Sequence, residues 1–273
     1  ALFRFSQLEL PWALGPPDGR YLIRRDGDGA GGAPEHVLVL STLGALERRR
    51  IGPSRRQRKA RPEPEPMLVE TTRATIVDVG DPLPDPERAA AWLNRAGEPE
   101  LAGGLAVLNR ALHAHRVATA DPRSHGVGRS DALVARIGYG AGEEVADGKW
   151  TDARELIDPG PRRRRSRIPA AQARLAALLT GRERALACEE LALRARLDLG
   201  ENRDREAALQ VRIAFDAALA ELPADPAGHA LAERIEELRT LSATIAGADP
   251  EALSVALGRL ESALRARSAA LAD

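Results

Sequence analysis

The sequence predicts an α+β protein: a β-rich N-terminal module with a long arginine-rich hairpin, a mostly helical middle and a C-terminal antiparallel helical bundle. Two segments rich in apolar and β-branched residues, 36–46 and 67–79, flank a run of basic residues. Aromatic residues make up only 3% of the chain, so its cores must be built largely from Ala, Leu, Val and Ile. From residue 169 onward, leucines recur at helical spacing. A length of 273 residues is enough for about two domains.

The β-rich module spans residues 1–84. Its strand candidates are the short apolar or β-branched runs 21–24, 37–40 and 71–79. A glycine-dense turn, 26–32, separates the first two, because glycine readily adopts positive φ. We expect the second and third strands to pair as a long hairpin. Proline at positions 62, 64 and 66 keeps the returning arm extended and stiff.

The tip of this hairpin is strongly basic, although the whole chain holds 40 acidic and 40 basic residues. Charge is therefore segregated along the sequence. Arginine forms a planar fork that suits both carboxylates and phosphates. The candidate binding residues of the tip, with no acidic residue among them, are Arg48, Arg49, Arg50, Arg55, Arg56, Arg58, Lys59 and Arg61. A second basic cluster consists of Arg162, Arg163, Arg164, Arg165 and Arg167.

The middle segment, 85–157, is expected to be mainly helical. Asp85 is a suitable N-cap and Pro86 a suitable first residue for a helix that ends near residue 95. A second helix is expected over 100–118, and a short one over 131–137 with Ser130 as its N-cap. Residues 158–168, which contain the second basic cluster, are expected to form a linker.

Residues 169–273 predict the helical bundle. The expected helices are 170–199 (one helix, or two interrupted at Thr180-Gly181), 203–222, 226–246, and one that begins at Asp249-Pro250. In the last helix, leucines at spacings of four, three and four form a heptad seam: Leu253, Leu257, Leu260 and Leu264. This seam is either part of the bundle core or a surface for a partner helix.

A short motif at the start of the bundle is similar to a known family. Leu179-Thr-Gly-Arg-Glu-Arg184 resembles the opening of LuxR-type DNA-binding domains, and this resemblance implies DNA binding through a helix-turn-helix. The resemblance covers these six residues alone. Residues 185–199 continue as uninterrupted helix formers, without the glycine-containing turn that precedes a recognition helix.

Chemistry-bearing residues concentrate in 113–150, which is therefore the candidate region for an enzyme site. His113 and His115 lie two apart, so on a helix they point to different faces and chelate poorly. Gly128-Arg-Ser-Asp-Ala132 lacks the final glycine of a nucleophile elbow. Gly138-Tyr-Gly-Ala-Gly142 lacks the Lys-Ser/Thr of a phosphate-binding P-loop. We predict no cofactor and no metal site, a site formed with Asp121 being the residual alternative.

The single cysteine, Cys188, excludes an internal disulfide framework. No stretch approaches 18 apolar residues, the length needed to span a membrane. The N-terminus lacks the apolar region of a secretory signal peptide. The sequence therefore predicts a soluble cytoplasmic protein without membrane insertion.

Three functional classes follow, in this order. The first is a non-catalytic interaction or assembly protein, which docks through the basic hairpin on an acidic protein surface or associates with itself through the bundle as a homo-oligomer. The second is a nucleic-acid-binding protein, whose arginine clusters contact phosphates. The third is an enzyme with its site in 113–150. The absence of a concentrated catalytic set in the sequence favours the first.

Overall fold

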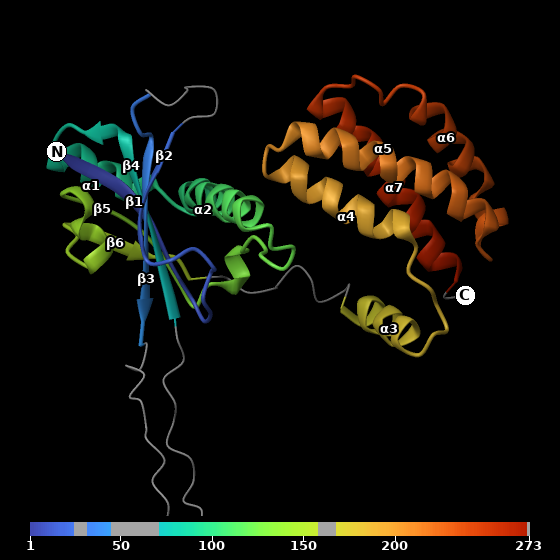
Figure 1. Ribbon diagram of the computed structural model, residues 1–273, viewed down its shortest axis with the longest axis horizontal. Coiled ribbons are helices and arrows are strands. Elements are labelled where there is room, and N and C mark those ends of the chain that lie inside the picture. Colours follow the sequence, from blue (N-terminus) through green and yellow to red (C-terminus); the bar gives the residue numbers. More distant parts are fainter. Residues whose placement is uncertain (25–31, 45–70, 158–167, 272–273) are drawn as a thin grey trace, which may run out of the picture. The chain divides into compact units, whose positions relative to one another are not determined.

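The structure is a computed structural model that describes residues 1–24, 32–44, 71–157 and 168–271 (Figure 1). The chain divides into two compact units, Ala1–Pro159 and Gly160–Asp273. The first contains an antiparallel sheet with two helices, and the second is helical (Figure 1). The predicted α+β class is confirmed.

The first unit is built on a six-stranded antiparallel sheet of order β2-β3-β4-β1-β5-β6. Strands β1, β5 and β6 were not predicted from the sequence, and β1 lies between β4 and β5 in the interior of this sheet. The six strands are β1 (Leu2–Leu10), β2 (Gly19–Ile23), β3 (His36–Leu43), β4 (Thr71–Leu83), β5 (Val134–Gly140) and β6 (Asp152–Glu155).

Two helices, α1 (Pro86–Arg95) and α2 (Glu98–Thr119), pack on one face of the sheet. As predicted, the Asp85 carboxylate caps α1 by accepting a hydrogen bond from the Arg88 amide at 2.7 Å. The apolar side chains along one side of α2 are buried against the strands, because burial removes their apolar surface from water. The core between them includes Leu8, Leu38, Ile76, Leu101, Leu108 and Leu112.

The hairpin prediction is confirmed for the part of the chain that the structure describes. Strands β3 and β4 pair antiparallel from His36↔Asp78 to Leu43↔Thr71. The segment that joins Leu43 to Thr71 contains all eight basic residues of the predicted tip. These eight residues lie outside the described residues, so their contribution remains a prediction.

The predicted helix over 131–137 is wrong, because residues 134–140 form strand β5. A three-residue 3₁₀ turn, Arg129–Asp131, precedes it, so Ser130 is not a helix N-cap. The strand has period-two burial on its helix-facing side. Its glycines permit close packing: a Cβ on Gly138 would lie 2.5 Å from the backbone oxygen of Asp152.

His36, the first residue of β3, makes the first unit sensitive to pH. Burial lowers the pKa of its imidazole below the ordinary value of 6.5, against the opposing charges of Asp78 and Glu35. The unfolded chain therefore binds more protons than the folded chain between the two pKa values. The contribution of His36 to stability is fully present above pH 6.5 and is lost as the pH drops through 6.5 toward the lower folded pKa.

We expect His36→Gln to remove this part of the pH dependence. Urea midpoints measured above and below pH 6.5 should fall more on acidification for the wild type than for the variant. His125→Gln, at an exposed position, is the matched control and should behave as the wild type. An equal acid-induced fall in wild type and His36→Gln would contradict the assignment.

The second unit contains five helices among the residues described: α3 (Ile168–Leu179), α4 (Ala187–Gly200), α5 (Asp204–Glu221), α6 (Ala232–Ser242) and α7 (Pro250–Ala270). Residues 170–199 thus form two helices, the alternative with an interruption at Thr180-Gly181. As predicted, Asp249 caps α7 through the Ala252 amide at 2.8 Å. Helix α6 is shorter than the expected 226–246, because a 3₁₀ turn occupies Gly228–Leu231 before it and the helix ends at Ser242. The core includes Phe215, Leu231 and Leu257.

A buried ion cluster joins distant parts of this unit. The Arg267 side chain on α7 is only 2% exposed. Its guanidinium donates to Asp225 at 2.8 Å and to Glu183 at 3.2 Å, and also to the Arg184 carbonyl oxygen at 3.1 Å. Arg174 of α3 donates to Glu183 at 3.0 Å. Burial of a charge is tolerated here because each one is paired and hydrogen-bonded.

Candidate functional site

The sheet face opposite α1 and α2 carries a polar cluster, here called the Glu9 cluster. The residues that make it up come from the three adjacent strands β1, β4 and β5: Gln7, Glu9, Arg73, Thr75 and Arg136. Alternation along each strand places them on this face, because residues two apart on a strand point the same way. The register aligns Glu9 with Arg73 and Gln7 with Thr75 and Arg136.

Hydrogen bonds link the cluster into one network. Arg73 donates from Nε and Nη2 to Glu9 Oε1 at 3.2 and 3.0 Å. Arg136 Nη1 donates to the same oxygen at 3.3 Å and to Gln7 Oε1 at 2.9 Å. Gln7 in turn donates to the Thr75 hydroxyl at 3.0 Å. Gln7 and Thr75 are fully buried, whereas the two guanidinium side chains keep 21–23% exposure.

Aromatic rings flank the cluster. The Arg136 guanidinium lies 5.6 Å from the ring centre of Trp150, a cation–π distance. The Trp150 ring stacks on Phe5 at 5.8 Å. Val145, from the 3₁₀ turn Gly142–Asp147, packs with Phe5 in the small apolar core on this face. These contacts fix the position of one of the two arginines.

The cluster lies near the end of the sheet from which the basic segment leaves. Arg73 is paired with Ser41 of β3, only two residues before the hairpin pairing ends at Leu43↔Thr71. The register therefore places Arg73 two residues from Thr71, the end of the described part of β4, with Arg136 two strands away on β5. Strands β3 and β4 are thus connected to each other in sequence by the segment that contains residues 48–61, the most basic part of the chain.

The chemical groups of the cluster are suited to hydrogen bonding with an anion. Glu9 accepts from two arginines, so its carboxylate is already paired and is poorly suited to act as a general base. Two guanidiniums and one carboxylate leave one excess positive charge. Unused N–H groups of Arg73 and Arg136 remain as donors for a carboxylate or phosphate.

Most binding residues predicted from the sequence lie outside the described residues. This holds for Arg48–Arg61 and for the second cluster, Arg162–Arg167. The heptad seam is described, and it is buried in the core of the second unit: Leu253, Leu257, Leu260 and Leu264 are 1%, 0%, 0% and 8% exposed. Helix α7 contacts α4 and α5. Helices of the same chain thus cover the seam, which favours its role as bundle core.

The chemistry-bearing residues of 113–150 occupy different surroundings. His113 and His115 are partly buried on α2, whereas His125 and Ser130 are exposed in the following connection. Tyr139 is buried on β5 in the core under the helices. Within the described ranges, no group of three or more His, Cys, Asp or Glu side chains is placed to hold a metal ion. No described helix is long and apolar enough to cross a membrane.

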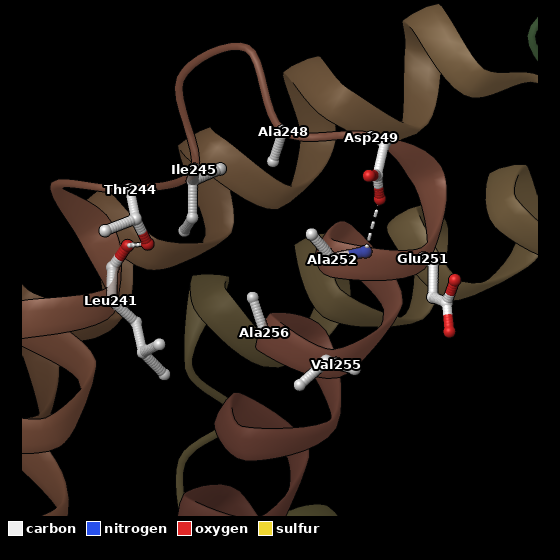
Figure 2. Close-up of a pocket in the computed structure, with 9 residues that line it drawn as sticks. All are labelled: Leu241, Thr244, Ile245, Ala248, Asp249, Glu251, Ala252, Val255 and Ala256. Carbon is white, nitrogen blue, oxygen red and sulfur yellow. Dashed lines mark hydrogen bonds between the residues drawn. The ribbon is translucent and has the colours of Figure 1, made fainter.

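A hollow in the second unit lies between the end of α6 and the start of α7 (Figure 2). Its volume is about 390 Å³, and apolar residues such as Leu241, Ile245 and Val255 line it. Two polar groups of the lining are hydrogen-bonded locally: Asp249 caps α7, and the Thr244 hydroxyl donates to the Leu241 carbonyl oxygen at 2.8 Å. The hollow therefore presents an apolar surface without a catalytic set.

Sequence reasoning missed the Glu9 cluster. The available signal was the pair of alternating polar residues in β1, Gln7 and Glu9, together with Arg73 and Thr75 in β4. The two residues of each pair lie two positions apart, as expected for one face of a strand.

No protein-family model, curated protein or solved structure matches the chain.

Proposed function

We propose that the protein is a non-catalytic interaction protein that docks on an acidic protein surface through its arginine-rich hairpin. One observation carries this proposal: β3 and β4 are paired residue by residue up to Leu43↔Thr71. The basic segment therefore starts and ends on adjacent strands of one sheet. A rigid base of this kind restricts where a charged segment can be presented, and so lowers the entropy lost on binding.

Charge segregation supports an acidic protein as the partner, with a second copy of the chain included. Residues 48–61 hold eight basic residues and no acidic one, so all 40 acidic residues lie elsewhere. The rest of the chain thus has an acidic excess that complements the segment. Complementary charge steers association and sets its orientation.

Nucleic acid is the competing partner, and two features weigh against it. Glu63 and Glu65 directly follow the basic run and would repel phosphates. Aromatic residues, which stack on bases in many single-strand-binding proteins, form 3% of the chain. A partner surface of mixed charge fits both the arginines and these two glutamates better.

The triple substitution Arg55→Ala, Arg56→Ala and Arg58→Ala tests the proposal in the full chain. Binding to polyglutamate, followed by fluorescence anisotropy, should weaken by about tenfold, because three exposed ion pairs contribute a few tenths to about 1 kcal/mol each. The dependence of affinity on salt should also flatten. The matched control replaces three exposed arginines of the same unit with alanine: Arg88, Arg116 and Arg123.

The control removes the same charge and should retain most of the affinity. Equal losses in the two triple variants would contradict docking through the hairpin, since net charge alone would then explain binding. A triple Arg→Lys variant at 55, 56 and 58 keeps the charge and removes the planar fork. Its intermediate affinity would identify paired hydrogen bonds to carboxylates as part of the contact.

A further inference from the structure

Helix α3 of the second unit is packed in an unusual way. Of its residues 171–179, none is buried, and its one charged residue is Arg174. The leucines Leu175 and Leu179 are 55% and 79% exposed. Small side chains, Ala171 and Ala177, line the space between α3 and the rest of the unit. Most helices are stabilised by burying their larger apolar residues. Because α3 turns alanines rather than these leucines toward the rest of the unit, a space remains between them.

That room is a groove of about 960 Å³ between α3, α4 and α7. Its apolar walls include Ala177 of α3, Ala192 and Leu193 of α4, and Leu264 of α7. Leu193 is 69% exposed. Protein interiors rarely leave voids much larger than a water molecule, whereas ligand pockets occupy about 300–1,000 Å³. The volume of the groove lies within the range of ligand pockets.

Among the described residues around the groove, two arginines are not paired with a carboxylate. Glu183 and Glu189 are each paired with both Arg174 and Arg267. The Glu261 carboxylate accepts from Arg196 at 2.8 Å. In contrast, Arg182 and Arg265 are exposed, line the groove and have no carboxylate partner among the described residues. The acidic residues of the lining are thus already paired with arginine, and the spare charge is positive.

We propose that this groove binds a single-chain amphiphile with a carboxylate head, such as a fatty acid. Its acyl chain lies along the alanine and leucine walls, where it leaves water. Its carboxylate is held by Arg182 and Arg265, which have no carboxylate partner among the described residues; Arg182 Nε also donates to the Thr180 hydroxyl at 3.2 Å. This site is separate from the docking segment and does not depend on the proposed docking function.

Titration of the full chain with dodecanoate, followed by isothermal calorimetry, tests the site. We expect saturable binding of one dodecanoate per chain. The double variant Arg182→Glu/Arg265→Glu should bind at least about tenfold more weakly, because two favourable charges become repulsive. Arg259→Glu, on the same helix α7 but beside Glu237 and outside the groove, should bind as the wild type does.

Ala177→Trp tests the cavity itself. The indole fills space under α3 and should abolish binding, whereas the urea midpoint should stay unchanged because residue 177 is outside the core. Dodecyltrimethylammonium, which has a similar chain and the opposite charge, should not bind. No binding of dodecanoate, equal binding of the ammonium compound, or full binding by a folded Ala177→Trp variant would overturn the proposal.

Discussion

Arg267→Met is expected to lower the free energy of unfolding of the helical unit by about 3–5 kcal/mol, the cost of breaking a buried ion pair from one side. Methionine retains much of the side-chain volume but cannot donate hydrogen bonds. Asp225, itself 4% exposed, would lose the donor at 2.8 Å, and Glu183 would lose the one at 3.2 Å. Urea unfolding followed by circular dichroism measures this loss.

Arg265→Met is the matched control, because Arg265 lies on the same helix but is exposed. Its effect should stay within about 0.5 kcal/mol, as for most surface substitutions. Equal urea midpoints for the two variants would contradict the cluster. If Arg267→Met does not fold, Arg267→Lys keeps one charge in place, and its midpoint should lie below that of the wild type.

Alanine substitutions at two adjacent glycines of α2, Gly103 and Gly104, are expected to change the free energy of unfolding in opposite directions. A Cβ on Gly104 would lie 2.6 Å from Ser6 Cβ, so the helix would have to move away from the sheet. We expect Gly104→Ala to cost about 1–3 kcal/mol, as overpacking does. A Cβ on Gly103 meets nothing within 4 Å. Gly103→Ala should therefore gain about 0.5–1 kcal/mol through helix propensity.

Urea midpoints of the two single variants check the difference, and each serves as the control for the other. Ser6→Gly removes the atoms that the new Cβ would meet. Combined with Gly104→Ala, it should therefore recover part of the loss through a favourable coupling between the two sites. If both glycine variants were stabilised equally, α2 would not pack on β1 as closely as the structure has it.

Local signals were enough to predict several elements. Asp85-Pro86 and Asp249-Pro250 mark the starts of α1 and α7, because a cap and a first-turn proline act within one helical turn. β-Branched runs indicated β3 and β4. Strand β1 was missed because polar residues occur on both of its faces, Ser6 on one and Gln7 on the other. The alternation of Gln7 and Glu9 with Leu8 and Leu10 is therefore interrupted at Ser6, which leaves only four residues of regular pattern.

The remaining errors and omissions arise from long-range packing. Gly138 and Gly140 lie inside β5, in a segment predicted as helix up to residue 137, and neighbouring chain segments approach both too closely for a Cβ. The Glu9 cluster joins residues that are 64 and 127 positions apart. Such a cluster requires the strand order and register, which no local pattern contains. The groove under α3 likewise depends on how α4 and α7 meet.

We expect the basic hairpin to prefer an acidic protein surface to nucleic acid. The most direct test is to measure the affinity of the full chain for polyglutamate and for duplex DNA of the same number of charges, over a range of salt concentrations. We predict that polyglutamate binds at least as tightly as the duplex. Tighter binding of the duplex, with a slope of log affinity against log salt of about −0.9 per phosphate contacted, would contradict the claim.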